Sequence, residues 1–271
     1  SYNSCVGGST YQDFVDEKIL ENILKIGVRA IDFELYLKDG VVVIAAGAKG
    51  ATCTATNTCG LKTTYNHIPF KTAYDIVKQN AFIPPYNQYP LFINLRINSE
   101  NPIIYDKITN IILPTEKFGN MLENTMNAIE KDPRLFNSWP NHNIIHSCYV
   151  KDHPRYKEYY KDISKISILD TQGKIIFMCD NNQYNGINDL LQNREGNIKF
   201  LSLITISDKL KNQYPSQLAY NIIGGNQKIL KEEFQRKFGK CYPDISTNGK
   251  NPNWEKVFET GCQFMFMNFN N

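Results

Sequence analysis

Four histidines are the first candidates for acid–base chemistry in this sequence, because the ordinary pKa of histidine lies close to neutral pH. They are His67, His142, His146 and His153. His142 and His146 are four residues apart, but Pro140 before them and Ile144-Ile145 between them favour a strand or a turn. The two side chains therefore need not share a face. We interpret the histidines as surface or core residues, not as a catalytic pair.

The cysteines could in principle bind a metal or form disulfides. They are Cys5, Cys53, Cys59, Cys148, Cys179, Cys241 and Cys262. Their number is odd and no CxxC pair occurs, which argues against a zinc ribbon or a dense disulfide framework. The pattern favours an intracellular, reducing compartment. A bridge between Cys53 and Cys59, inside a Thr-rich loop, stays open as an alternative.

Composition restricts the partners that the chain could have. It has 271 residues, of which 42% are hydrophobic, with 30 basic and 27 acidic side chains and a net charge of +3. No dense Lys/Arg block is present, so nucleic acid is not the expected partner. The longest apolar stretch, near residues 41–46, is far below the roughly 20 residues of a membrane-spanning helix.

Helices and strands alternate along the chain, which favours an α/β barrel or a layered sheet. Over residues 17–26 (EKILENILKI) the apolar side chains have helical spacing, and Asp13 or Asp16 could cap this helix. Before residue 100, we expect helices at 17–26 and 69–82, strands at 29–37, 41–46 and 91–97, a turn at 38–40 and a loop at 48–66. After it, we expect helices near 102–112, 119–131 and 216–238, strands near 144–150, 174–179, 198–206 and 262–269, and a peripheral excursion at 152–173.

Several short segments resemble, in order and spacing, the X and Y regions of phosphoinositide-specific phospholipase C. Ser1-Tyr2-Asn3-Ser4 resembles the family's Ser-His-Asn-Thr, and residues 27–34 (GVRAIDFE) resemble its Gly-x-Arg-x-x-Glu-x-Asp strand. Residues 43–47 lie where the family has Tyr-His-Gly. Residues 90–97 (PLFINLRI) are similar to the strand that carries an acidic metal ligand in calcium-dependent members. The segments from Cys241-Tyr242-Pro243 to residue 269 resemble the Y region.

The resemblance implies an α/β fold, a TIM-barrel-like distorted β/α barrel of the phospholipase C-like phosphodiesterase type. It covers almost the whole chain, so we expect a single domain over residues 1–271. Within it, an X-like part would span about 1–180 and a Y-like part about 198–271. The Phe- and Met-rich residues 264–269 would then form a barrel strand that is buried on both sides.

A looser resemblance points to phospholipase C-like proteins of large DNA viruses. It rests on the SYNSC and DFELY segments and on residues 66–70 (NHIPF). This resemblance makes a virus particle one expected location, with an intracellular reducing compartment as the other.

Both positions at which the family carries a catalytic histidine hold other residues here, namely Tyr2 and Ala46. An alanine side chain transfers no proton, and a tyrosine with a pKa near 10 is a poor base at neutral pH. His67 could replace them only from the far side of the loop at 48–66. The resemblance therefore implies a degenerate site in which no catalytic residue is intact.

The metal site is altered as well. The resemblance carries three oxygen ligands that a Ca²⁺ ion could accept onto Asn3, Asp32 and Glu34, but the fourth position aligns with Arg96. We expect Arg96 to pair with Asp32 or Glu34 in place of a metal, so that neither Ca²⁺ nor another cofactor is bound. Lys240 is the remaining basic candidate in this pocket. The set is either a structural ion-pair network or a remnant of a ligand site.

These residues lead to one expected function and two alternatives. We expect a catalytically inactive barrel that serves as a structural or interaction protein, with other proteins of an assembly as partners. Weak contact with lipid headgroups or a membrane surface is a further alternative to a solvated helix face, because Tyr156, Tyr159 and Tyr160 are interleaved with lysines. One alternative is an active phosphodiesterase that uses Tyr2, Arg96 and a displaced histidine. The other is a non-catalytic binder of phosphoinositol or another phosphate ester at Asn3, Asp32 and Arg96.

Overall fold

The computed structural model describes the parts of the chain that build its central sheet. These are residues 1, 3–7, 12–46, 63–97, 124–125, 128–129, 132–134, 167–180, 200–207, 217–219, 239–241, 251 and 254–267. The helices are α1 (Glu17–Lys25), α2 (Phe70–Asn80), the 3-10 helix η3 (Ile168–Thr171) and α7 (Trp254–Glu259). The strands are β1 (Gln12–Asp13), β2 (Ala30–Lys38), β3 (Val41–Ile44), β4 (Thr63–Thr64), β5 (Ile68–Pro69), β6 (Leu91–Ile97), β7 (Ile175–Asp180), β8 (Phe200–Ser207), β9 (Gln217–Ala219), β10 (Gly239–Cys241) and β11 (Phe264–Met265).

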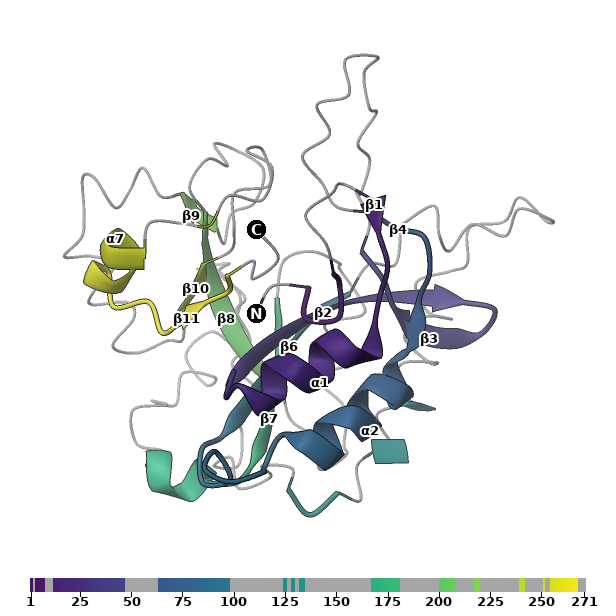
Figure 1. The fold of residues 1–271 in the computed structure, drawn as a ribbon. Helices are drawn as coiled ribbons and strands as arrows, with labels where there is room; N and C mark the ends of the chain where they lie inside the picture. The colour runs from purple at the N-terminus through teal and green to yellow at the C-terminus, as the bar shows by residue number, and fades with distance from the viewer. Residues whose placement is uncertain are drawn as a thin grey trace, which may run out of the picture.

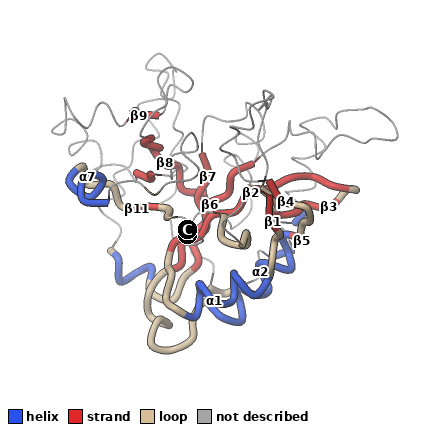
Figure 2. The backbone as a smooth tube through the Cα atoms, turned by 45° about the horizontal axis from the view of Figure 1, so that its top comes forward, coloured by secondary structure: helices blue, strands red, loops and turns tan. Residues whose placement is uncertain are grey.

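A nine-stranded sheet has the order β11-β10-β8-β7-β6-β2-β3-β5, and β9 pairs with β8 outside this order. Strands β2, β6, β7 and β8 are neighbours and run parallel. Helices α1 and α2 lie side by side against one face of this sheet (Figures 1 and 2). The parallel centre of the sheet agrees with the α/β pattern that the alternating sequence predicted.

Side chains on β2 alternate between two environments, as the pleat of a strand requires. Ile31, Phe33 and Leu35 are fully buried on the helix-covered side, where the Phe33 ring packs edge-on against Phe70 of α2 at 6.2 Å. The residues between them, at 32, 34 and 36, point to the other face of the sheet. A strand that is apolar on one face and polar on the other thus fixes which side carries the chemistry.

The turn between β2 and β3 ends the parallel pattern. Asp39 and Gly40 both have positive φ, 50° and 77°, and an Asp-Gly pair in this conformation favours a tight hairpin. Strand β3 therefore returns antiparallel to β2, as predicted from Lys38-Asp39-Gly40.

The expectation of a closed barrel needs correction. Among the strands that the structure describes, no ladder joins β11 to β5, so the sheet is mixed and open. The described sheet is mixed because β2 continues directly into the antiparallel strand β3, and β3 pairs antiparallel with β5. The sheet is nevertheless curled: the rings of Phe92 on β6 and Phe264 on β11 are 4.7 Å apart, although three strands lie between them.

Other expected elements have mixed outcomes. The helices at 17–26 and 69–82 and the strands at 29–37, 41–46, 91–97, 174–179 and 198–206 are confirmed, with small shifts of their ends. The helix near 216–238 is wrong at its start, because residues 217–219 pair with β8 as β9. The strand near 262–269 is confirmed only at Phe264–Met265. The helix at 102–112, the strand at 144–150, most of the loop at 48–66 and most of the excursion at 152–173 lie outside the described residues.

Helix α1 provides a test of the local sequence signals. Asp16 is its N-cap, and its side chain accepts a hydrogen bond from the Lys18 backbone N–H at 2.8 Å. Replacing Asp16 by Ala should lower the free energy of unfolding by about 1 kcal/mol, since this N–H loses its acceptor. Chemical denaturation would measure the loss. The matched control is Asp75→Ala, on the exposed surface of α2, which should change stability by less than about 0.5 kcal/mol; equal losses would contradict the capping role.

Candidate functional site

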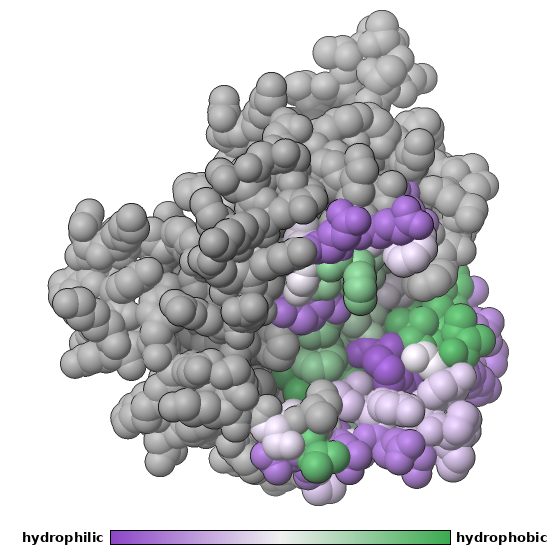
Figure 3. Space-filling view, turned by 90° about the vertical axis from the view of Figure 1, so that its left-hand side faces the viewer, coloured by the Kyte–Doolittle hydropathy of each residue, from purple (hydrophilic) through white to green (hydrophobic). Residues whose placement is uncertain are grey.

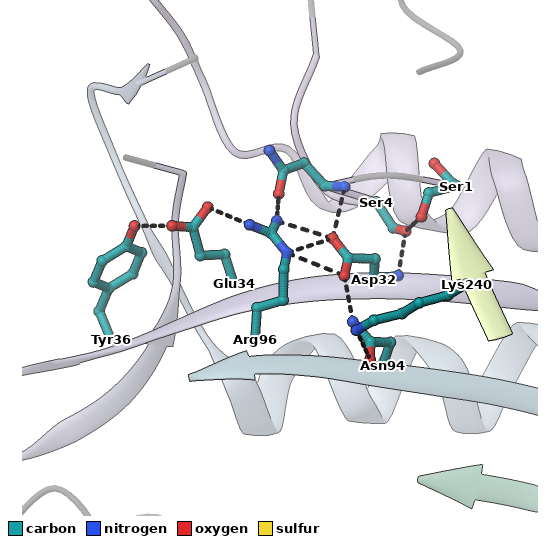
Figure 4. A network of polar contacts seen from close by, with 9 residues as sticks. Ser1, Ser4, Asp32, Glu34, Tyr36, Asn94, Arg96 and Lys240 are labelled. Atoms are coloured by element: carbon teal, nitrogen blue, oxygen red, sulfur yellow. Dashed lines mark hydrogen bonds and ion pairs between the residues drawn. The ribbon is translucent and has the colours of Figure 1, made fainter. Parts of the chain in front are cut away.

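The candidate site lies where β2 and β6 run side by side on the face of the sheet away from α1 and α2. In their parallel register Asp32 is opposite Asn94, and Glu34 is opposite Arg96. Because residues two apart on a strand share a face, the four side chains lie next to one another on that face (Figure 4). The hydrophobic residues at the odd positions of both strands set this register.

Arg96 is the centre of the site. Its Nε donates to both carboxylate oxygens of Asp32, at 3.1 and 3.0 Å, and its Nη2 donates to Oδ2 of the same group at 2.9 Å. Nη1 donates to Glu34 Oε2 at 3.2 Å, and Nη2 also contacts Oδ1 of Asn3. The ion pairs that were predicted for Arg96 with Asp32 or Glu34 are both present. The fork of the guanidinium suits this arrangement, since it offers several donors in one plane.

Asp32 is completely buried and receives donors from several directions. In addition to Arg96, the Asn94 amide donates to its Oδ1 at 2.6 Å and the Asn3 backbone N–H to its Oδ2 at 3.2 Å. Burial disfavours the charged form, but the positive charge and hydrogen bonds of Arg96, the charge of Lys240 and the Asn94 amide outweigh it. The pKa of Asp32 is therefore held below its ordinary value.

The N-terminal segment completes this side of the site. Ser4 Oγ accepts from the Asp32 backbone N–H at 2.9 Å, and the Ser4 backbone N–H donates to the Asp32 carbonyl at 2.9 Å. The Ser1 nitrogen donates to the Ala30 carbonyl at 2.6 Å. These bonds attach Ser1 and Ser4 to β2 and hold Asn3, which has a positive φ of 43°, over Asp32.

Glu34 and Lys240 extend the network in two directions (Figure 4). Glu34 accepts a hydrogen bond from the Tyr36 hydroxyl on the same strand. Lys240, on β10, is completely buried, and its ammonium group donates to Asn94 Oδ1 at 3.0 Å. Sequence reasoning did not single out Asn94, although its place two residues before Arg96 on one strand was a usable signal.

Of the two residues that stand at the positions of the family's catalytic histidines, the structure describes one. Ala46 is buried after the end of β3, where its backbone N–H donates to Thr64 Oγ1 at 3.0 Å and its carbonyl accepts from the Thr64 backbone N–H at 2.9 Å. Its methyl group offers no proton-transfer chemistry. Tyr2 lies outside the described residues.

None of the four histidines is shown beside the site. His67 precedes β5 and lies in the electrostatic field of Lys38 and Asp39, at the β2–β3 turn. Partial burial and the charge of Lys38 lower its pKa, which keeps it neutral at pH 7. His142, His146 and His153 lie outside the described residues.

The oxygen atoms that the resemblance assigned to Ca²⁺ do converge, but they converge on a guanidinium. Asn3, Asp32 and Glu34 all contact Arg96, which brings a positive charge to the place a divalent cation would need. The residues present therefore do not fit a metal ion. Among the described residues, no cluster of three or more His, Cys, Asp or Glu side chains could hold one. In the same part of the chain no helix is long and apolar enough to cross a membrane.

Comparisons with known proteins bear on the fold. No protein-family model matches the chain, and no curated protein matches it. Among solved structures, the whole chain superposes on the phospholipases C L. pealei PLC21, with a TM-score of 0.59 and 12% identity, and S. officinalis PLC21, with 0.61 and 13%. The chain has a phospholipase C-like fold. It spans 33% of the length of either protein.

A bacterial structure is similar to the chain with a lower score. It is a calcium-dependent phosphoinositol-specific phospholipase C from Pseudomonas sp., with a TM-score of 0.47 and 10% identity over 92% of this chain and 83% of that one. At 12 and 13% identity, the similarity to the two PLC21 structures shows the phospholipase C-like fold alone.

Arg96 gives the sharpest stability test. Replacing it by Met would remove the ion pair between Arg96 and the buried carboxylate of Asp32, so the free energy of unfolding should fall by about 3 to 5 kcal/mol. Denaturant titration would measure the change, with Lys71→Met as control because the Lys71–Asp75 pair is exposed and should cost less than about 1 kcal/mol. If the two substitutions cost the same, Arg96 does not balance the buried charge.

The lowered pKa of Asp32 predicts how stability depends on pH. A carboxyl group whose pKa is lower in the folded state stabilises the fold above its unfolded pKa of about 4, and this contribution is lost as the pH falls through the folded pKa. Unfolding free energy should therefore decrease below about pH 4. Asp32→Asn should be less stable at pH 7 and show a shallower decrease on acidification. The same acid slope in both proteins would contradict the assignment.

Proposed function

We propose that this chain is a phospholipase C-like protein without phosphodiesterase activity that acts as a structural or interaction protein. One observation carries the proposal: the guanidinium of Arg96 lies among the oxygen atoms of Asn3, Asp32 and Glu34 and makes hydrogen bonds to all three. Because the guanidinium of Arg96 already binds the carboxylates of its own site, the arrangement favours a role in stability.

The chemistry of phosphodiester cleavage makes demands that these residues meet poorly. The reaction needs a proton acceptor for the attacking hydroxyl and a proton donor for the leaving group, each contributing about 10²- to 10⁴-fold. Ala46 can supply neither, and Tyr2 is a weak base at neutral pH. The carboxylate of Asp32 could accept a proton only by giving up its bonds to Arg96 and Asn94.

Charge balance also argues against a phosphate-binding module. Among the described residues of the network, the two carboxylates of Asp32 and Glu34 face the cations Arg96 and Lys240, so these formal charges cancel. A phosphate group would have to displace a carboxylate from Arg96 and would meet the other one nearby. Lys240 is completely buried and already donates to Asn94, which leaves it poorly placed to receive a headgroup.

A role in contacts with other proteins is supported by exposed aromatic side chains. Trp254 and Phe258, one turn apart on α7, expose 58% and 73% of their surface, and Phe14 and Tyr65 form an exposed ring pair with centroids 5.3 Å apart. Figure 3 shows hydrophobic patches on the described part of one face, between hydrophilic ones. Exposed aromatic groups are enriched in protein interfaces. A large assembly, for example a virus particle, is the setting we propose.

The decisive experiment is a phosphatidylinositol cleavage assay on the purified protein, with and without Ca²⁺. We expect no turnover under either condition, because Ala46 transfers no proton, Tyr2 is a weak base at neutral pH, and the carboxylate of Asp32 is held by Arg96 and Asn94. A parallel variant with Tyr2→His and Ala46→His asks whether histidines at these positions are sufficient to restore activity.

The alternatives predict other results. Turnover by the unaltered protein that Arg96→Ala abolishes would overturn the proposal in favour of an active hydrolase with a non-standard site. Saturable binding of inositol phosphate in calorimetry, without turnover and lost in Arg96→Ala, would favour the phosphate-ester binder. An Asp75→Ala protein serves as the control in both assays, since Asp75 lies on the surface of α2.

A further inference from the structure

The hydrogen bond between Lys240 and Asn94 joins strands that are not neighbours. Lys240 is on β10 and Asn94 on β6, and β8 and β7 lie between them in the sheet. Strands are about 4.8 Å apart, so three spacings would separate the two backbones by roughly 14 Å in a flat sheet, with side chains pointing out of it. The 3.0 Å bond between Nζ and Oδ1 therefore crosses the concave side of the curled sheet.

This bond continues into the site of Arg96. Asn94 accepts from Lys240 with its carbonyl oxygen and donates with its amide nitrogen to Asp32 Oδ1 at 2.6 Å. Asp32, Asn94 and Lys240 are each completely buried. The Asn94 amide therefore links the cation Lys240 to the anion Asp32 through two hydrogen bonds. Buried hydrogen bonds to charged groups contribute more to stability than exposed ones.

We propose that Lys240, Asn94 and Asp32 form a latch, meaning a chain of buried polar contacts that holds β10 against the N-terminal strands. Strand β10 has only three residues, and its ladders to β8 and β11 are correspondingly short. The contact across the sheet supplements these ladders, and its strength depends on the negative charge of Asp32. The local stability of β10 is thereby tied to the site around Arg96, whether or not that site catalyses a reaction.

Two cysteines of the chain report on the latch. Cys241 follows Lys240 on β10, is completely buried and is a free thiol. Cys5 is equally buried and free, but it lies in the N-terminal segment beside β2. A thiol reagent can reach either one only when its surroundings open, so the two labelling rates separate opening of β10 from unfolding of the whole protein.

The experiment is thiol labelling of the full chain under native conditions, with mass spectrometry of peptides to read each cysteine separately. In Lys240→Met, labelling of Cys241 should accelerate about 10- to 100-fold, as expected for loss of a hydrogen bond to a charged group, while Cys5 keeps its rate. Lys240→Gln keeps a donor for Asn94 but no charge. Its Cys241 labelling rate should lie between the rates of the unaltered protein and of Lys240→Met. It also provides the measurement if Lys240→Met does not fold.

A control variant and a double variant complete the test. Lys78→Met removes an exposed lysine of α2 and should leave both rates unchanged. In an Asp32→Asn background the effect of Lys240→Met on Cys241 should shrink, because the charge that the latch uses is gone. An unchanged Cys241 rate in both Lys240 variants would overturn the proposal. Equal acceleration of Cys5 and Cys241 would also overturn it, since the lysine would then stabilise the whole fold.

Discussion

The arrangement of this site depends on one completely buried carboxylate, whose charge several other groups compensate. Asp32 is charged at the centre of the sheet, where an uncompensated charge would cost several kcal/mol. Arg96 supplies the main compensation, Asn94 adds a second donor and brings in Lys240, and the N-terminal segment adds the Asn3 backbone N–H. Segments far apart in the sequence are thus held at one point by one group.

The apolar side of the sheet determines where this group lies. Ile31, Phe33 and Leu35 pack under the helices, so Asp32 and Glu34 must face away from them. A shift of β2 by one residue would place both carboxylates among the helix contacts and the apolar residues in the polar site. The hydrophobic core and the ion-pair network therefore favour the same register of β2. A register shifted by one residue would disrupt both.

Much of the local structure could be predicted from the sequence, because local signals decide it. Asp16 marks the start of α1, Asp39-Gly40 marks the hairpin, and the alternation along β2 and β6 places Asp32, Glu34 and Arg96 on one face. Opposite charges on one face of neighbouring strands must then pair. The fold class followed from a resemblance between short segments, and the comparison with solved structures supports its phospholipase C-like part.

The features that could not be predicted from the sequence depend on contacts between residues far apart in the chain. The reach of Lys240 to Asn94 depends on the curl of the sheet, which no segment of the chain encodes alone. Pairing with β8 makes residues 217–219 a strand, although their sequence was compatible with a helix. The antiparallel end of the described sheet depends on how β3 pairs with β2 and β5, and local patterns of alternating helices and strands do not contain that information.

The guanidinium in the centre of the site is part of the polypeptide, and this has a consequence for how the fold responds to its surroundings. A bound ion stabilises a protein by mass action, so the gain rises and falls with the concentration of free ion. Arg96 is attached to β6 and cannot dissociate from its carboxylates into solution. The stabilisation it provides therefore needs no free ion to bind and does not follow the concentration of one.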